Sequence, residues 1–193
     1  MAGHARYTAV LDACVLYPVA LADALISLAA VGVFAAKWTT LIESEWIRSL
    51  EADRPDLVGR LEYLRDQMRR AALDWEVPEA AWRPLTDGLT LPDPNDVHVL
   101  AAAIAGHADG IVTTNLVDFP LAILAQHGLE RIHPDEFIVA QIDLDRVSSL
   151  SAFRAMRGRR QNPQNSPFEF AAALERNGLP LTAERLRECA DLI

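Results

Sequence analysis

The sequence predicts an α/β fold in which strands alternate with helices around a central parallel sheet. Three short β-rich apolar segments, 7–11, 110–114 and 129–133, are separated by stretches with helical periodicity. This alternation is typical of parallel sheets, because a parallel connection crosses over through a helix. Since 51% of the 193 residues are apolar, the chain can bury a sizeable core.

Helices are predicted between the first two of these strands. A proline opens an Ala- and Leu-rich helix over residues 18–31, as proline suits a first helical turn. Thr39 or Thr40 caps the next helix. Residues 56–71 form an amphipathic helix, and 72–90 are mixed, with a short strand or an edge segment as the alternatives.

Further helices are predicted over 93–107 and 120–126, and Gly128 ends the second of them. The last strand is followed by a helix over 135–141. Strands and helices therefore alternate along this part of the chain.

The tail differs from the rest of the chain and is expected to be helical, which gives predicted domains of 1–142 and 143–193. Residues 166–169, Ser-Pro-Phe-Glu, form a capping-box sequence with proline at the first helical position. Gly178 fits a helix C-cap, and Thr182 is expected to cap a final helix.

The net charge of −9 disfavours a protein that coats nucleic acid nonspecifically, because phosphate contacts dominate such binding. Residues 1–142 carry 20 acidic and 10 basic residues, and residues 143–193 carry 7 and 8. Two arginine clusters are Arg60, Arg65, Arg69 and Arg70, and Arg154, Arg157, Arg159 and Arg160. Solvated helix faces and a nucleic-acid contact are the two interpretations of these clusters.

Cys14 and Cys189 are far apart and show no C-x-x-C spacing, which argues against a disulfide framework or a zinc site. No apolar run reaches the ~18–20 residues that a membrane span needs. Residues 1–6 do not have the layout of a signal peptide, so a cytoplasmic protein without a membrane anchor is expected.

Acidic side chains at predicted strand ends and helix starts are the candidates for function. They come from four segments: Asp12, Glu45, Asp93 with Asp96, and Asp118. Several carboxylates at core-facing positions need compensation, and a shared divalent metal ion supplies it. The carboxyl ends of parallel strands share one edge of the sheet, so we expect these acids to converge there. Oxygen ligands favour Mg²⁺ or Mn²⁺ over zinc.

Helical phase separates the two central acids of the helix from Thr39 to Leu50. Glu45 falls within the apolar stripe and is expected to face inward, whereas Glu43 lies at its edge and is expected to be solvated. An inward Glu can pair with arginine or bind a metal, and the other acids favour the metal. His98 lies off the stripe of its own helix and is expected to face solvent.

Capping is the alternative for the aspartates. Asp93 is a good N-cap and Asp96 suits a helix N-terminus, so capping could explain both. Asp96 leads an apolar stripe, which favours it as the ligand and Asp93 as a cap with a second role. Asp12 is equally explained as a turn or capping residue. A plain loop would also account for Asp118.

The order and local contexts of these acids resemble those of a PIN domain over roughly residues 6–140. The matching segments are residues 10–16, 45–48, 93–96 and 111–119. Four acidic positions in the family's order are more specific evidence for the resemblance than a single Asp motif. The tail, with Arg157, Asn162-Pro163 and residues 178–180, resembles the helical C-terminal extension of some VapC-type toxins.

The resemblance implies a three-layer α/β/α domain with a helical C-terminal extension, acting as a Mg²⁺- or Mn²⁺-dependent endoribonuclease. It also implies a homodimeric toxin that a cognate antitoxin holds inactive and that cleaves RNA with metal-activated water. The family's metal-binding and catalytic positions correspond to Asp12, Glu45, Asp96 and Asp118. Thr114, Asn115 and Asp93 match supporting positions, and either Asn115 or Asp118 takes the fourth ligand position.

Other functions remain open on the sequence. A PIN nuclease could act in RNA maturation or on DNA, and a degenerate PIN fold could be a binding module. A haloacid-dehalogenase-like phosphatase fits poorly, because it needs a second Asp where this chain has Cys14 and a late lysine where the single lysine is Lys37. A response-regulator receiver also needs that late lysine.

Overall fold

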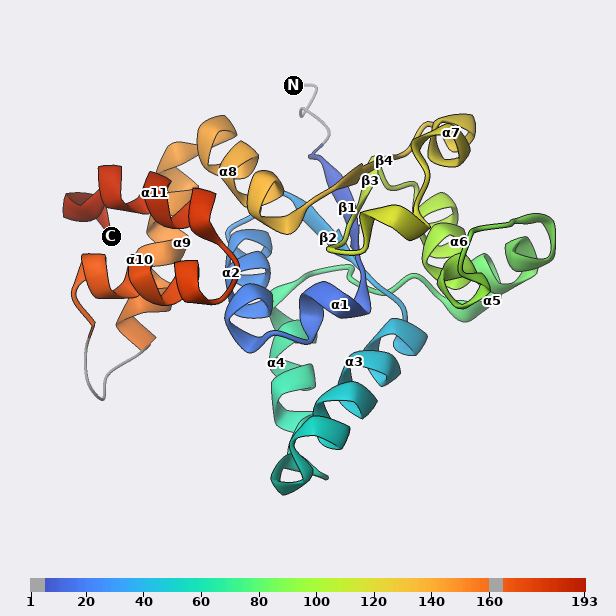
Figure 1. Ribbon diagram of the computed structural model, residues 1–193, viewed down its shortest axis with the longest axis horizontal. Helices are drawn as coiled ribbons and strands as arrows, with labels where there is room; N and C mark the ends of the chain where they lie inside the picture. The colour runs from blue at the N-terminus through green and yellow to red at the C-terminus, as the bar shows by residue number, and fades with distance from the viewer. Residues whose placement is uncertain (1–5, 160–164) are drawn as a thin grey trace.

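The computed structural model describes residues 6–159 and 165–193. Its centre is a four-stranded sheet with the order β2-β1-β3-β4 (Figure 1). The strands are β1 Thr8–Leu11, β2 Ala35–Lys37, β3 Gly110–Val112 and β4 Glu130–Ile132. β1 pairs in parallel with β2 and β3, and β3 pairs in parallel with β4. The predicted central parallel sheet is confirmed.

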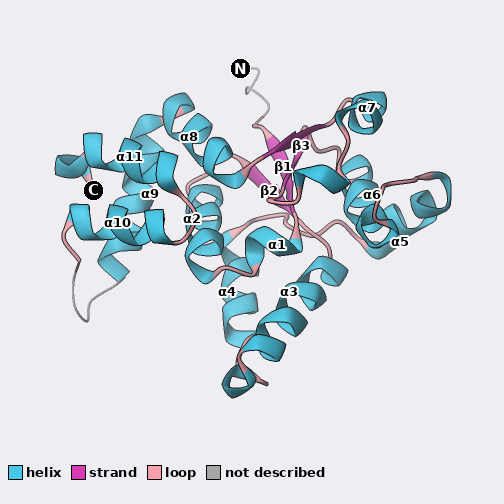
Figure 2. Ribbon diagram, viewed as in Figure 1, coloured by secondary structure: helices cyan, strands magenta, loops and turns pink. Residues whose placement is uncertain are grey.

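Helices cover both faces of the sheet and make a three-layer α/β/α arrangement (Figure 2). The α-helices are α1 Ala13–Leu16, α2 Val19–Ala30, α3 Thr40–Asp53, α4 Glu62–Ala71, α5 Glu79–Trp82, α6 Val97–Ala105, α7 Leu121–Leu124, α8 Pro134–Leu144, α9 Arg146–Arg159, α10 Pro167–Arg176 and α11 Pro180–Glu188. Short 3₁₀ segments are η1 Pro55–Leu57, η2 Arg83–Gly88, η3 Pro94–Asp96, η4 Leu116–Asp118, η5 Ala125–His127 and η6 Ala190–Leu192. α2 contacts β2, and α6 contacts β1 and β3. None of the helices in the described ranges is both long and apolar enough to cross a membrane.

The strand ends are level at the carboxyl edge of the sheet. The Asp12 N–H donates to the Val112 carbonyl (3.2 Å), and the Thr113 N–H donates to the Ile132 carbonyl (3.1 Å). These bonds extend the parallel ladder by one residue beyond β1 and β3. The segments that follow the two strands therefore leave the sheet side by side, which brings their polar side chains to one edge.

Several helix boundaries follow the predicted capping chemistry. Thr39 caps α3 with its hydroxyl, which accepts from the Ile42 N–H at 3.1 Å. Ser166 and Glu169 form a reciprocal capping box at the start of α10. Gly128 has a φ of 69°, so a residue free to adopt the left-handed conformation ends the turn after α7.

Some elements differ from the prediction. β2 and α1 were not expected, because three residues and a single turn are too short to show a period. The helix expected over 56–71 begins only at Glu62, after the turn η1. In the mixed segment 72–90, Glu76 forms an isolated parallel bridge with Trp38, and α5 and η2 complete the segment.

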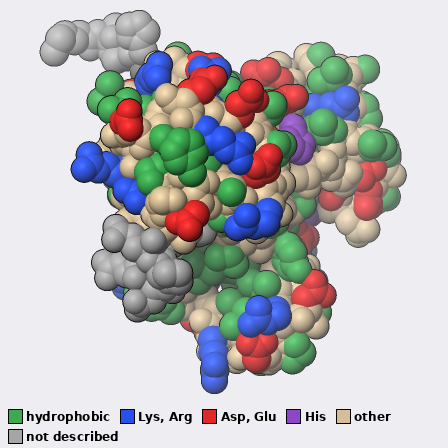
Figure 3. Space-filling model, turned by 60° about the vertical axis from the view of Figure 1, so that its left-hand side comes forward, with side chains coloured by type: hydrophobic (Ala, Val, Ile, Leu, Met, Phe, Trp, Pro, Cys, Tyr) green, Lys and Arg blue, Asp and Glu red, His purple; other side chains and the backbone are tan. Residues whose placement is uncertain are grey.

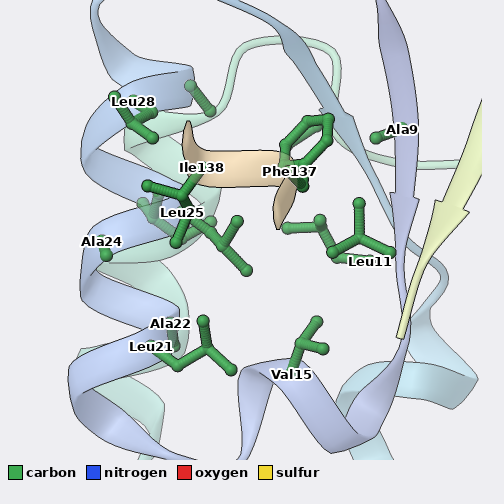
Figure 4. Packing of buried hydrophobic residues seen from close by; sticks show 14 of the residues in the cluster. Ala9, Leu11, Val15, Leu21, Ala22, Ala24, Leu25, Leu28, Phe137 and Ile138 are labelled. Atoms are coloured by element: carbon green, nitrogen blue, oxygen red, sulfur yellow. The ribbon is translucent and has the colours of Figure 1, made fainter. Parts of the chain in front are cut away.

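The core lies between β1, α2 and α8 (Figure 4). Leu11 from β1, Leu25 from α2 and Ile138 from α8 are each 0% exposed. Phe137 of α8 meets Phe34 edge-on with ring centroids 4.8 Å apart. Burying each of these side chains stabilises the fold by about 1.5–3 kcal/mol, so α8 is part of the core that supports the sheet.

The tail is fixed to α8 by a buried carboxylate. Asp135 is 2% exposed and accepts hydrogen bonds from the N–H groups of Leu181 and Thr182 (both 2.8 Å) and from the Thr182 hydroxyl (2.7 Å). The expectation that Thr182 caps the final helix is wrong: α11 begins two residues earlier, and Asp135 satisfies its first N–H groups from another helix.

The tail and the sheet share one continuous hydrophobic cluster that runs from β1 to α11. Arg157 donates to the Asn165 carbonyl at 2.8 Å, and Asn162-Pro163 lies outside the described residues. Gly178 follows α10 with a φ of 83°, which fits the predicted end of that helix. The predicted domain boundary between residues 142 and 143 stays a prediction.

Phe137→Ala is expected to lower the free energy of unfolding by about 3–5 kcal/mol, because it leaves a cavity between α8 and the sheet. Urea denaturation measures this change. Leu144→Ala on the same helix is the control, since Leu144 is 73% exposed and its truncation should change stability by no more than about 0.5 kcal/mol. Equal effects of the two substitutions would contradict the placement of Phe137 in the core.

Candidate metal centre

Asp93 and Asp96 lie on the turn that leads into α6. The Asp93 Oδ1 atom accepts from the Asn95 N–H at 2.8 Å, so Asp93 caps η3 as expected. Asp96 directly precedes α6, and its side chain makes no capping hydrogen bond. The Asp96 carboxylate is thus left free of the helix that it precedes, and it is oriented toward other partners.

Three carboxylates converge beside this turn. Asp93, Asp96 and Asp118 each offer an oxygen, and these atoms all lie within 4.8 Å of one another. Asp118 comes from η4, which follows β3. The Asn115 amide Nδ2 donates to Asp118 Oδ2 at 2.6 Å and to Asp96 Oδ2 at 3.3 Å, so one neutral side chain connects the two loops.

Asp12 is held at the end of β1 by two neutral donors. It is 6% exposed, and its Oδ2 atom accepts from the Thr113 hydroxyl at 2.7 Å and from the Cys14 thiol at 3.1 Å. Burial and the Asp12 charge raise the pKa of the Cys14 thiol, so it stays protonated and acts as a donor. The edge lies where β1 meets the starts of α1 and α3 (Figure 1).

Thr113 was missed by the sequence analysis, which selected Thr114. Thr113 is 0% exposed and reaches Asp12, whereas Thr114 is exposed and contributes its backbone N–H to the Cys14 sulfur at 3.3 Å. The available signal was strand alternation, because Thr113 continues β3 by one residue and its side chain can point toward the neighbouring strand end.

The expectation that Glu43 is solvated is wrong. Glu43 is 4% exposed, and both of its oxygens accept from the Arg69 guanidinium, with Nε at 3.0 Å from Oε1. Arg69 lies over the Trp75 ring at 4.7 Å from its centroid. The arginine-paired glutamate of α3 is therefore Glu43, because the Arg69 side chain reaches it from α4 on the side of α3 that the apolar stripe did not mark.

The expectation that His98 faces solvent is also wrong. His98 is 9% exposed, and its Nε2 atom lies 2.9 Å from Oε1 of Glu45, whose side chain is 30% exposed. Trp82 of α5 covers the imidazole, with ring centroids 6.1 Å apart. The cover comes from the segment 72–90, whose structure the sequence left undetermined.

The site concentrates negative charge. Burial, followed by the charges of Asp12, Asp93 and Asp118, raises the pKa of Asp96 to about 6, and His98 opposes the shift. Glu45 and Asp12 lie outside the set within 4.8 Å, which among the described residues comprises Asp93, Asp96 and Asp118. The oxygen donors and their mutual repulsion fit a hard divalent cation such as Mg²⁺ or Mn²⁺.

Two models of known protein families match this chain. A family model described as PIN domain matches residues 8–116, which is more than half of the chain. The chain belongs to the PIN domain family. A second model, described as VapC50 C-terminal domain, matches residues 134–188. The PIN assignment agrees with the central parallel sheet.

One curated relative is named "Putative ribonuclease VapC50" and comes from Mycobacterium tuberculosis (strain ATCC 25618 / H37Rv). It is 37% identical to this chain over 79 residues, which are 41% of this chain and 47% of the relative. The matched region thus spans about half the length of that relative. No solved structure matches the chain.

The raised pKa of Asp96 predicts a pH-dependent stability in the absence of metal. Because the folded pKa is about 6 and the ordinary value is 3.8, the folded state binds this proton more tightly than the unfolded chain does. The stability contribution of Asp96 therefore falls as the pH rises from about 4 to about 6. Asp96→Asn should raise Tm relative to the unsubstituted protein at pH 7 in EDTA, and the gain should vanish near pH 4.

Asp145→Asn is a control of opposite sign. Hydrogen bonds from Ser148 lower the pKa of Asp145, so its contribution to stability is present at neutral pH and is lost as the pH falls. This variant should have a lower Tm than the unsubstituted protein at pH 7. A Tm gain for Asp96→Asn that is the same at pH 4 and pH 7 would contradict the electrostatic origin of the effect.

Proposed function

We propose that this PIN protein is a metal-dependent endoribonuclease and the toxin of a type II toxin–antitoxin pair, acting in the cytoplasm. The observation that carries the proposal is the convergence of three carboxylates within 4.8 Å, one of which has a raised pKa. Family membership and the ribonuclease name of the curated relative support it. A cognate antitoxin and a homodimeric state belong to the same proposal.

The proposed metal-binding and catalytic residues are Asp12, Glu45, Asp96 and Asp118. Asp93 joins them in the proposal, because its carboxylate lies in the same cluster as Asp96 and Asp118. When bound, Mg²⁺ or Mn²⁺ lowers the pKa of water and neutralises charge on a phosphodiester. The donor set consists of carboxylate oxygens, which suits either ion.

The remaining polar side chains orient the acids. Thr113 and Cys14 both contact Oδ2 of Asp12, so Oδ1 is the oxygen that remains for a metal. Asn115 contacts Oδ2 of both Asp96 and Asp118 and holds these two loops in register. We propose that the Asn115 amide holds the carboxylates of Asp96 and Asp118 at a fixed separation, and that Asp118, not Asn115, takes the fourth ligand position.

Arginines away from the site are proposed to bind the RNA backbone. Internal pairs neutralise part of both clusters: Arg65 with Asp66, Arg69 with Glu43 and Arg159 with Asp23. Arg60, Arg70 and Arg154 are exposed. Figure 3 shows acidic and basic side chains interspersed on the face that it presents, so this face offers no continuous basic surface. Binding through a few arginines fits the recognition of a folded RNA by its shape better than it fits nonspecific coating of RNA.

Asp12→Asn is expected to abolish both RNA cleavage and growth arrest on induced expression, because it removes a carboxylate while preserving shape and the Thr113 contact. Cleavage is measured by sequencing RNA ends after induction and by incubating purified protein with RNA in Mn²⁺ or EDTA. Asp56→Asn is the matched control, because Asp56 is an exposed partner of Arg54 and lies outside the site. A fully active, metal-stimulated Asp12→Asn protein would overturn the assignment.

The alternative functions give different results in the same experiment. A nuclease of RNA maturation cleaves RNA in vitro, but its induction does not arrest growth. A degenerate PIN module does not cleave RNA. Mn²⁺ also does not raise its Tm in a way that depends on Asp12, so Asp12→Asn leaves the effect of Mn²⁺ on Tm unchanged. The acid cluster favours the nuclease, since a binding module has no need to hold repelling carboxylates together.

A further inference from the structure

We propose that His98 is a positioning residue that fixes the carboxylate of Glu45 for metal binding, an inference that rests on the proposed function. The observation is the contact of 2.9 Å between His98 Nε2 and Glu45 Oε1. This distance is that of a charge-assisted contact between an imidazole N–H and a carboxylate. Oε2 of Glu45 is then the oxygen that would be left to hold a cation.

Glu45 needs such a partner more than the aspartates do. Each aspartate in the site is already oriented through one of its oxygens by a neutral donor: Asp12 by Thr113 and Cys14, Asp93 by the Asn95 N–H, and Asp96 and Asp118 by Asn115. Glu45 has a longer side chain, and it projects from α3 with 30% of its side chain exposed. Without a partner it would lose more rotamer freedom on binding a metal.

His98 is itself held rigidly. It lies on the first turn of α6, two residues after Asp96, and is 9% exposed, with the tilted Trp82 ring beside it. Its contact with Glu45 connects α3 to the helix that follows Asp96. The imidazole thus sets the position of one proposed ligand relative to another that lies on a different element.

The second imidazole nitrogen supports a functional reason for this histidine. Nδ1 is buried and has no hydrogen-bond partner among the residues that the structure describes. An unpaired buried nitrogen is unfavourable, and an apolar side chain such as leucine would occupy the space without that cost. Departures of this kind from good packing chemistry concentrate at functional sites. The Nε2 contact to Glu45 is the compensation that this location offers.

Two substitutions of similar polarity separate positioning from packing. The amide nitrogen of glutamine reaches about as far from the backbone as Nε2, whereas that of asparagine reaches only about as far as Nδ1. His98→Gln should keep Mn²⁺ affinity close to that of the unsubstituted protein. His98→Asn should weaken it by about 10–100-fold, the usual effect of losing a partner that orients a ligand. Isothermal titration with Mn²⁺ alone gives the affinity, and the Tm in EDTA reports the fold.

His98→Leu is a second variant that lacks the donor but fills the apolar space, and it replaces His98→Asn if that protein does not fold. In a Glu45→Gln background, removing the donor should cause no further loss of Mn²⁺ affinity, because the two residues act through one interaction. Equal weakening by His98→Gln and His98→Asn, or additive losses with Glu45→Gln, would assign His98 a packing role only.

The inference and the proposed function fail in different ways. If Asp12→Asn and Glu45→Gln weaken Mn²⁺ binding while His98→Asn and His98→Leu do not, His98 does not position Glu45 and the proposed function stands. If Asp12→Asn and Glu45→Gln leave Mn²⁺ binding unchanged, both the proposed metal site and the role of His98 are wrong.

Discussion

Repulsion between carboxylates at the carboxyl edge of the sheet is the constraint on which the site depends. The acids there are oriented by hydroxyl, thiol, amide and backbone donors, which fix geometry without cancelling charge. Among the described residues, no lysine or arginine forms an ion pair with Asp12, Asp93, Asp96 or Asp118. Glu43 shows the contrast. It lies on α3, as Glu45 does, but the guanidinium of Arg69 on α4 neutralises its charge. Glu43 and these aspartates thus differ in the charge of their partners.

The PIN fold holds this repulsion in place through rigid neighbours. β1 is central in the sheet, and its apolar residues pack against α2 and α8, so the position of Asp12 is set by buried structure. β3 delivers Asn115 and Asp118 from the adjacent strand, and η3 delivers Asp96 at the start of α6. Like charges therefore meet because the backbone leaves them little freedom to separate.

Local chemistry in the sequence predicted much of this arrangement, and tertiary cover explains the rest. The strand before Asp12 and the caps at Thr39 and Ser166 depend on residues close in sequence, so they could be read directly. The burial of Glu43 and His98 depends on α4 and α5, which approach from distant parts of the chain. Helical phase identifies which side of a helix is apolar, but it does not show which polar side a neighbouring helix will cover.

The contact of Asp135 with the start of α11 has a practical consequence for dissecting the protein. A chain shortened before α11 would keep a carboxylate in a buried position after losing the three donors that satisfy it. The same shortening would strip apolar cover from α8 and α9, which pack on the helices next to the sheet. Loss of function in a truncated protein would then report damage to the hydrophobic core, and point substitutions on exposed positions of the tail are the cleaner way to test the role of the tail.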